Sequence, residues 1–579
     1  MSKLNVDQKN IEALLSDKKS DFLIPDYQRP YAWDENNCQT LWDDIFAFAF
    51  PNNNSEDFDE SEEYFLGSIV TFKNEKGKLE VIDGQQRLTT LMLILRAFYD
   101  KFANMQDNNS KLTRTRIEKC IWRTDTFGTA DKSFLKIDSE VATDNDKGEF
   151  LELLKTGVVV LPGSKSNYVK NYQFFQAKIN EFLSTFPGYF AYLPARMLGN
   201  CILLPIEAES QDTALRIFST LNDRGLPLSD ADIFKAQFYK YYGDKGEKDD
   251  FIEEWKNLEE ITGRIFHPFT GTPMDELFTR YMYYLRAKEG NKKTTVEALR
   301  KFFERNKYQY LKTDQTIKDL KSLALFWEST VLENDDTFSE DIRKKLFVLN
   351  YAPNGMWQYI TSVYYLDRNA DGKLEESSFA AFLDKITAFI FAYAITNPGV
   401  NALRSPLFEE LINLIKGEPV SFENRKFNEQ QARSFFENFE FTNGRPITRS
   451  LITWYAYTFK NQALLDTNKS FQIEHIFARK RQDMERSLTK QSNLESLGNK
   501  VLLEESINIS ASDYRFEDKK KIYSGAQRRG KNQEPSQIAE IQDIIELNEF
   551  DETAILNRNQ VILNKFFEFL RNENLLVSE

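Results

Sequence analysis

The stretch that most constrains the fold is "VIDGQQRLTTLMLILRAFYDKF", residues 81–102. Residues 85–102 are apolar enough to predict a helix that is largely buried. Residues 78–83 predict a strand, and Asp83-Gly84 suits a tight turn because glycine takes a positive φ at no steric cost. We therefore expect a strand, a tight turn and a core helix in direct succession.

The first turn of this helix is a natural seat for a phosphate group. It offers backbone N–H groups and the positive end of the helix dipole. Side-chain donors come from Gln85, Gln86 and Arg87, and the Arg87 guanidinium can donate two hydrogen bonds to phosphate oxygens. Arg29 could supply a second cation if the fold brings it near. A strand-turn-helix with solvated polar residues explains the composition equally well. A P-loop is excluded, because the Walker lysine motif is missing.

The neighbouring segments predict a helix-rich α+β chain. Residues 64–72 and 78–83 read as a hairpin, and residues 201–209 read as a further strand. Helices are expected in three further segments of the first half, at 37–50, 212–225 and 228–242, the last with Ser229 as its N-cap. From about 245 to 440 the pattern is mostly helical. This organisation predicts an α/β domain followed by a helical region.

Four motifs in the first half resemble the DUF262 family, which is part of GmrSD-type modification-dependent restriction enzymes. They are "IPDYQRPYAW", "YFLGSIV", "VIDGQQRLTTL" and "IFSTLNDRGLPLSDADIFK", in that order over residues 20–240. The resemblance implies a ParB/sulfiredoxin-like fold, with NTP binding and hydrolysis around the turn. It assigns the nucleotide site to Gln28, Arg29, Asp83, Gly84, Gln85, Gln86 and Arg87, with Asp83 and Arg87 as catalytic residues. Asn222, Asp223, Arg224 and Gly225 also match a family motif, and we expect them to serve in packing or in a polar network.

A second constellation surrounds His475, one of only two histidines in the chain. It ends the short strand-like run "SFQIEH" and directly follows Glu474. Hydrolysis of a phosphodiester needs a base for the water, which a neutral histidine can supply, and a hard cation for the developing charge. Downstream, "LGNKVLLEESINIS" predicts a strand and then a helix that would return Asn508 towards Glu474. Taken alone, a histidine at the end of a strand is more often structural.

The order of these residues resembles the HNH, or ββα-metal, nucleases and specifically the DUF1524 domain, over residues 445–570. The resemblance implies that His475 is the general base and that Glu474 and Asn508 bind Mg²⁺ or another divalent cation. Asn499 would tether the loop and orient His475 through a hydrogen bond. The chain departs from many relatives at Ala478, where they have proline, and at Glu474, where they have aspartate. Neither difference removes a required chemical group.

Charge is distributed unevenly along the chain. The net charge of -14 argues against nonspecific binding of nucleic acid over the whole protein surface. It is compatible with a local basic groove, because phosphate binding depends on the charge at the contact. Residues 515–531 carry seven basic and two acidic residues. The resemblance implies that five of them contact the DNA backbone, namely Lys519, Lys520, Lys521, Arg528 and Arg529. A solvated loop is the alternative for each one.

Together these features predict three domains: a nucleotide-binding sensor at 1–243, a helical linker at 244–444 and a nuclease at 445–579. We expect an NTP-responsive endonuclease that acts on double-stranded, foreign phage DNA and works as a possible homodimer. The preferred NTP (GTP, UTP or ATP), the DNA modification and the effect of nucleotide on cutting stay open. A non-cleaving ParB-like regulator and an NTP hydrolase that only binds DNA are the alternatives. The charged start and the apolar pattern predict a cytoplasmic protein without a membrane span, and three scattered cysteines predict reduced, buried thiols.

Overall fold

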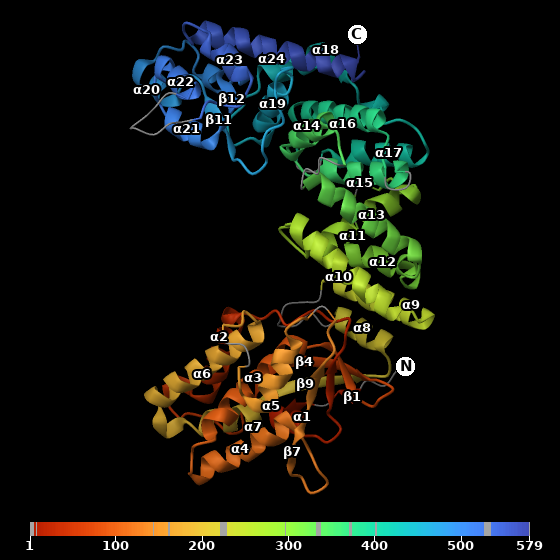
Figure 1. The fold of residues 1–579 in the computed structure, drawn as a ribbon, viewed down its shortest axis with the longest axis vertical. Coiled ribbons are helices and arrows are strands. Elements are labelled where there is room, and N and C mark those ends of the chain that lie inside the picture. The colour runs from red at the N-terminus through yellow and green to blue at the C-terminus, as the bar shows by residue number, and fades with distance from the viewer. Residues whose placement is uncertain are drawn as a thin grey trace. The chain divides into compact units, whose positions relative to one another are not determined.

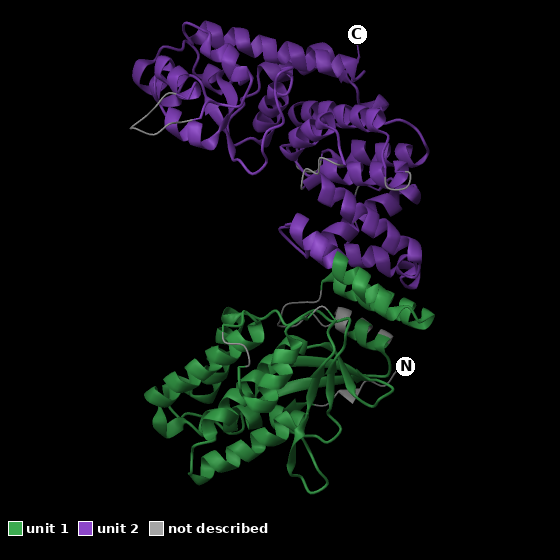
Figure 2. Ribbon diagram, viewed as in Figure 1, with its two compact units in different colours: residues 1–257 green, residues 258–579 purple. Residues whose placement is uncertain are grey.

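The structure is a computed structural model, and it describes most of the chain. The residues outside the description are 1–4, 7, 143, 160–162, 221–228, 294, 296, 332–336, 370–372, 400–401, 526–533 and 578–579. The chain divides into two compact units, Met1–Asn257 and Leu258–Glu579 (Figure 2). The three-domain division, with boundaries after 243 and 444, stays a prediction.

A mixed, seven-stranded sheet forms the centre of the first unit (Figure 1). Its strands are β1 (Asn5–Val6), β2 (Lys9–Asn10), β3 (Phe22–Ile24), β4 (Tyr64–Lys73), β5 (Leu79–Asp83), β8 (Ile137–Ser139) and β9 (Cys201–Ala208). The order is β1-β9-β4-β5-β3-β8, with β2 also on β9. The predicted hairpin is confirmed, because β4 and β5 pair antiparallel. A separate ribbon, not predicted, joins β6 (Trp122–Thr124) to β7 (Ala130–Leu135).

Helix α3 (Gln85–Phe102) is the core helix of this unit, and its bounds are those predicted from the sequence. It is buried over almost its whole length and packs against α4 and α6. Long apolar side chains at every turn account for this, since an all-round apolar helix needs contacts on all sides. The other helices are α1 (Ile11–Leu15), α2 (Glu35–Ala49), α4 (Asn108–Ile121), α5 (Lys147–Thr156), α6 (Asn167–Thr185), α7 (Tyr192–Asn200), α8 (Gln211–Thr220), α9 (Asp230–Lys245) and α10 (Lys248–Ile265), the last of which continues into the second unit.

Two predicted helix boundaries can be compared directly. Helix α9 begins after Ser229, whose side chain accepts from the backbone N–H of Asp232 in a capping box, as the sequence predicts. Helix α8 is described only to Thr220, so the predicted continuation to 225 lies outside the described residues. The motif Asn222, Asp223, Arg224 and Gly225 lies there too. Its role stays a prediction.

The second unit begins with a helical region, as predicted. It comprises α11 (Pro273–Lys288), α12 (Leu299–Glu304), α13 (Asp314–Val331), α14 (Glu340–Asn350), α15 (Met356–Arg368), α16 (Glu376–Thr396), α17 (Arg404–Ile415), α18 (Glu429–Glu437) and α19 (Pro446–Ala456). Strand β10 (Phe427–Asn428) pairs with β13 (Leu576–Val577). Among the described helices, α16 alone is long and apolar enough to span a membrane. Its apolar window is 61% buried inside the protein, which favours a core helix.

The C-terminal part of the second unit has the predicted order of strand, loop, strand and helix. Strands β11 (Phe471–His475) and β12 (Lys500–Glu504) pair antiparallel, and α21 (Glu505–Ala511) follows directly. The remaining helices are α20 (Arg479–Glu485), α22 (Phe516–Tyr523), α23 (Glu540–Ile545) and α24 (Glu552–Asn572). The helix-rich α+β class is thereby confirmed, and all three cysteines are free and buried as predicted.

Candidate functional site

The N-terminal candidate site is the turn between β5 and α3. Gly84 has φ = 89° and is the N-cap of α3 without a side-chain hydrogen bond to the first turn. A Cβ at this position would lie 3.0 Å from the carbonyl oxygen of Ser68 and 3.1 Å from Cγ1 of Ile69. Glycine is therefore required both by the backbone angle and by the close approach of β4. The turn leaves the positive end of the helix without an anionic cap.

The two glutamines after this glycine hold the segment 29–33 against the helix. The Gln85 side-chain amide donates to the carbonyl of Arg29 at 3.3 Å. The Gln86 amide donates to the carbonyl of Pro30 at 3.1 Å and accepts from the N–H of Ala32 at 2.7 Å. Both side chains are buried. Each amide uses one of its two N–H groups in these bonds, so a direct bond from either glutamine to phosphate stays a prediction for the second N–H group.

Arg87 is buried too, with its guanidinium against the backbone of β4. Its NH1 donates to the carbonyl of Ser68 at 2.8 Å. A Cβ at Gly67 would lie 2.7 Å from the guanidinium carbon, so Gly67 leaves the space that Arg87 occupies. Burial and this hydrogen bond give Arg87 a positioning role in the described arrangement. The predicted contact with phosphate would need part of the guanidinium to stay accessible.

The structure brings the remaining predicted nucleotide residues to the same turn. Gln28 is buried and donates to the carbonyl of Ile82 at 3.1 Å, one residue before Asp83. Arg29 follows it and is half-buried. Asp83 is the last residue of β5 and pairs with Val70. Predicted neighbours more than fifty residues apart in sequence are thus neighbours in the fold.

The C-terminal candidate site is built on β11, β12 and α21. Glu474 is buried, and its Oε1 accepts from Lys519 Nζ at 2.6 Å and from the Tyr523 hydroxyl at 2.8 Å. Burial raises the pKa of Glu474, and the Lys519 ammonium opposes that rise. Burial lowers the pKa of Lys519 despite the carboxylate beside it. A buried ion pair of this kind needs good geometry to offset the cost of removing both charges from water.

Lys519 therefore corrects a prediction. It was expected to contact the DNA backbone, but its side chain has no solvent exposure and binds Glu474. Lys520 is mostly covered and donates to the carbonyl of Leu547 at 2.8 Å. Lys521 is 69% exposed and stays the one suitable candidate among the described lysines of this run. Arg528 and Arg529 lie outside the described residues.

Asn508 lies on the same face of β11 as Glu474. Its amide nitrogen donates to the Gln472 side chain at 2.6 Å, and Gln472 is two residues before Glu474 in the strand. Side chains two apart in a strand point to the same face. By this alternation Asn508 and Glu474 lie on one side of β11, and their binding of a cation stays a prediction.

A divalent cation can be tested against the atoms present. Oε1 of Glu474 accepts from Lys519 and Tyr523, which leaves Oε2 as the oxygen that could bind a cation. The amide of Asn508 bonds Gln472 through nitrogen, which leaves its oxygen. Two oxygen donors suit Mg²⁺, which keeps several waters and uses few protein ligands. The described residues contain no group of three or more His, Cys, Asp or Glu side chains that could hold an ion. The donors fit a cation held mostly by water.

His475 makes a different set of contacts. Its Nε2 lies 2.8 Å from Lys500 Nζ and 3.6 Å from Glu495 Oε1. Lys500 also donates to Asn443 at 2.7 Å and to Glu495 at 2.8 Å. These three partners use all three N–H groups of the ammonium, so Nε2 of His475 is an acceptor.

The network keeps His475 neutral. Burial and the Lys500 charge lower the pKa of His475 to about 4. For Glu495, burial acts to raise the pKa, but hydrogen bonds from Lys500 and Arg479 lower it to about 2. A neutral imidazole has one lone pair, and Lys500 occupies it here. His475 can act as a base only if the Lys500 ammonium moves away from Nε2, for example to bond Glu495 alone.

Asn499 tethers the loop after β11, as predicted, although it bonds Phe477 and not His475. Its Oδ1 accepts from the N–H of Phe477 at 2.8 Å, and its Nδ2 donates to the Phe477 carbonyl at 3.1 Å. A further bond runs to the carbonyl of Leu494 at 3.1 Å. The side chain is fully buried. Asn499 therefore fixes the chain two residues beyond His475.

Four residues of this site were missed in the sequence: Glu495, Lys500, Tyr523 and, as an ion-pair partner, Lys519. The pattern of α22 carried a signal for the last two, because 519, 522 and 523 have the i, i+3, i+4 spacing of a buried helix face. Lys500 could be found only from the register that sets it opposite His475.

Comparison with protein families gives two matches, in the same order as the two sites. Residues 11–239 match the family model described as GmrSD restriction endonuclease, N-terminal domain. Residues 427–565 match the model described as GmrSD restriction endonucleases, C-terminal domain. No curated protein matches the chain. The first match contains the turn before α3, and the second contains Glu474, His475, Asn499 and Asn508.

Proposed function

Because this chain belongs to the GmrSD-like restriction endonuclease family, we propose that it is an NTP-responsive, metal-dependent nuclease that cuts foreign, modified phage DNA. The family implies DNA as the partner and restriction as the activity. The cutting site would be the β11–β12–α21 corner. The nucleotide site would be the turn before α3, in a ParB-like domain.

The observation that carries the proposal is the arrangement at the end of β11. An oxygen of Glu474 and the amide oxygen of Asn508 share one face, and a neutral histidine is the next and last residue of the strand. Alternation along β11 turns its side chain to the opposite face, so the proposal requires the imidazole to reach the phosphate around the end of the strand. This arrangement supports an HNH-type reaction. A divalent cation bound there would stabilise the charge that develops on the phosphate.

The protein's own residues would share the remaining work. His475 would accept the proton of the attacking water once Lys500 moves from Nε2. Lys519 and Tyr523 hold Oε1 of Glu474, which aims its other oxygen. Asn499 keeps the loop after His475 in place through Phe477. Lys500 thus becomes a positioning residue that restrains the base until DNA arrives.

The nucleotide part of the proposal rests on the N-terminal turn. Gly84 leaves the first turn of α3 without a side-chain cap, and the backbone of Arg29 is held beside it by the Gln85 bond. GTP, UTP or ATP would place phosphate oxygens at this helix end. Since Gln85, Gln86 and Arg87 each give one hydrogen bond to the fold, backbone N–H groups and Arg29 would make most contacts.

A nicking assay on supercoiled plasmid and on matched modified and unmodified phage DNA tests the nuclease assignment. Wild type is compared with His475→Ala, with and without Mg²⁺, EDTA and each NTP. Loss of a general base is expected to slow cutting by roughly 10²–10⁴-fold. His267→Ala is the matched control, because it removes the chain's other histidine from an exposed loop.

Full cutting by His475→Ala, or equal loss in His267→Ala, would contradict the assignment. DNA binding without cutting under every condition would favour the regulator. NTP turnover with DNA binding but no cutting would favour the hydrolase alternative. For the nucleotide site, Arg29→Ala is expected to weaken NTP binding about tenfold, and Lys76→Ala in the exposed β4–β5 loop serves as control.

A further inference from the structure

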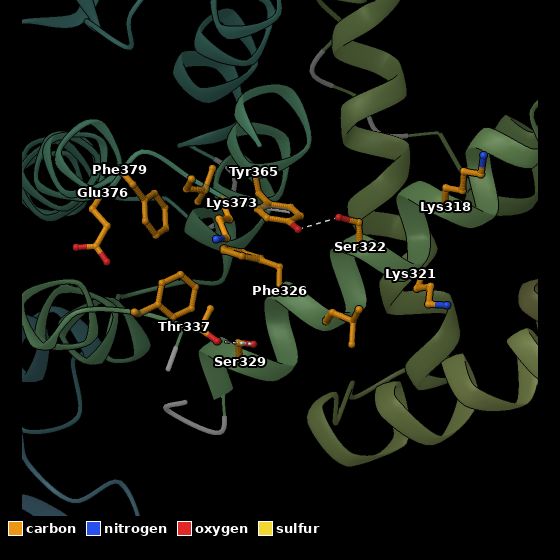
Figure 3. Close-up of a pocket in the computed structure, with 13 residues that line it drawn as sticks. Lys318, Lys321, Ser322, Phe326, Ser329, Thr337, Tyr365, Lys373, Glu376 and Phe379 are labelled. Atoms are coloured by element: carbon orange, nitrogen blue, oxygen red, sulfur yellow. Dashed lines mark hydrogen bonds between the residues drawn. The ribbon is translucent and has the colours of Figure 1, made fainter. Parts of the chain in front are cut away.

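The helical region between the two matched segments contains a cavity of about 650 Å³. One face of α13 forms a wall, with Lys318, Ser322, Leu325 and Ser329 at helical spacing. Helix α15 and the start of α16 close the other sides (Figure 3). Its volume falls within the roughly 300–1,000 Å³ of small-molecule sites.

The floor of the cavity is aromatic. Phe326 and Tyr365 stack with ring centroids 4.2 Å apart. Phe338 stands perpendicular to Phe326 at 5.9 Å, and Phe379 lies 6.1 Å from Phe338. All four rings are buried as residues, yet each lines the cavity. Because the rings contact one another, a ligand would lie on their faces and edges and would not insert between them.

Polar groups line the same space. The Ser322 and Tyr365 hydroxyls share a hydrogen bond of 2.7 Å, and Thr337 donates to Ser329 at 3.4 Å. Each hydroxyl keeps an acceptor or donor position that a ligand can use.

Lysines outnumber acids among the residues that line this cavity. Three lysines, at 318, 321 and 373, line it together with one acid, Glu376. The chain carries a net charge of -14. In Figure 3 the Lys373 ammonium points towards the rings of Phe326 and Tyr365, whereas Lys318 and Lys321 extend away from them. An anionic group is therefore favoured at the Lys373 end.

We propose that this cavity binds a small anion with a planar aromatic body, the ring system on the aromatic floor and the acidic group at Lys373. The acid could be a carboxylate of a simple aromatic acid or the phosphate of a nucleotide. This site is separate from the proposed nuclease and NTP sites, and its occupancy does not depend on either activity.

The test uses the full-length protein and the aromatic sulfonate 8-anilinonaphthalene-1-sulfonate as probe. Wild type is expected to bind one equivalent with a rise in fluorescence. Lys373→Glu is expected to weaken this binding at least about tenfold, because it reverses the charge beside the acidic group. Leu325→Ala, at a side chain 44% exposed on the cavity wall, is expected to weaken it several-fold without a change in circular dichroism. Lys312→Glu, an exposed lysine that is not among the lining residues, is the matched control.

Competition then identifies the source of the ligand. Displacement of the probe by 2-naphthoate but not by AMP, GMP or UMP indicates an aromatic acid, and displacement by one mononucleotide indicates a nucleotide. Unchanged binding in both Lys373→Glu and Leu325→Ala overturns the proposal. Equal loss in Lys312→Glu, or displacement by neither class, overturns it as well.

Discussion

Replacing Gly67 by alanine tests how firmly Arg87 is held behind the nucleotide turn. Gly67 has φ = +124° and lies at the register shift between β4 and β9. An added Cβ would lie 2.7 Å from both Cζ and NH2 of Arg87 and 2.8 Å from NH1. The guanidinium would have to leave the Ser68 carbonyl, its hydrogen-bond partner at 2.8 Å.

The expected cost follows from two contributions. A non-glycine residue in this backbone region costs about 1–3 kcal/mol. Loss of a buried hydrogen bond to a charged group costs roughly 1.5–3 kcal/mol. We expect Gly67→Ala to reduce the local unfolding free energy by about 3–5 kcal/mol. Gly77→Ala provides the control: φ there is also positive, at +78°, but the new Cβ would meet only Lys73 Cε at 3.8 Å. Its cost should stay near 1–2 kcal/mol.

Hydrogen exchange measured by mass spectrometry is the suitable assay, because protection of α3 and β4 peptides reports local opening. The double variant Gly67→Ala/Arg87→Leu isolates the steric contact, since removal of the guanidinium should recover part of the loss. Equal losses in Gly67→Ala and Gly77→Ala, or no coupling in the double variant, would refute the reasoning that Arg87 is fixed by its burial.

Three further predictions concern the C-terminal site. Asn499→Ala should reduce the free energy of unfolding by about 2–4 kcal/mol in urea denaturation, because it leaves the part-buried Phe477 backbone groups and the buried Leu494 carbonyl without these hydrogen bonds. Asn508→Ala should cost less than about 1 kcal/mol while abolishing nicking. A larger loss of stability in Asn508→Ala than in Asn499→Ala would contradict both roles. Lys519→Met should lower the free energy of unfolding by about 3–5 kcal/mol, because Glu474 stays buried without its cation. Adding Glu474→Gln should restore much of this loss. If urea denaturation shows no restored stability in the double variant, the ion-pair assignment is wrong. The pKa of His475 falls from 6.5 to about 4 on folding. Its contribution to stability is therefore complete above pH 6.5 and is lost as the pH falls towards about 4, by at most about 3 kcal/mol. The urea midpoint should depend less on pH in His475→Gln, and an unchanged pH dependence would rule out this residue as its source.

Local signals predicted the fold well wherever one segment determines its own structure. The apolar run of α3, the glycine turn before it and the Ser229 cap all depend on near neighbours in sequence, and each is found as expected. The β6–β7 ribbon was missed because its exposed strand β7 lacks an apolar alternation.

Prediction of the sites was weaker, because side-chain partners come from distant segments. Glu474 and Lys519 are 45 residues apart, and only the packing of α22 onto β11 brings them together. A run of three lysines indicates DNA contact by composition alone, whereas helix geometry turns the first one inwards. Likewise, the amides of Gln85 and Gln86 look fully available in the sequence, but the carbonyls of Arg29 and Pro30 already accept one N–H group of each.

The enclosure of α3 has a thermodynamic consequence for any ligand at its N-terminal turn. The core and residues 29–33 already order the side chains of α3. These groups would therefore lose almost no conformational entropy when a ligand binds at the turn. Recognition would be of the lock-and-key type, with discrimination between ligands decided by fit to a rigid template. Calorimetric titration would then show little ordering of the protein, and variants that loosen the helix would weaken affinity without touching a single contact atom.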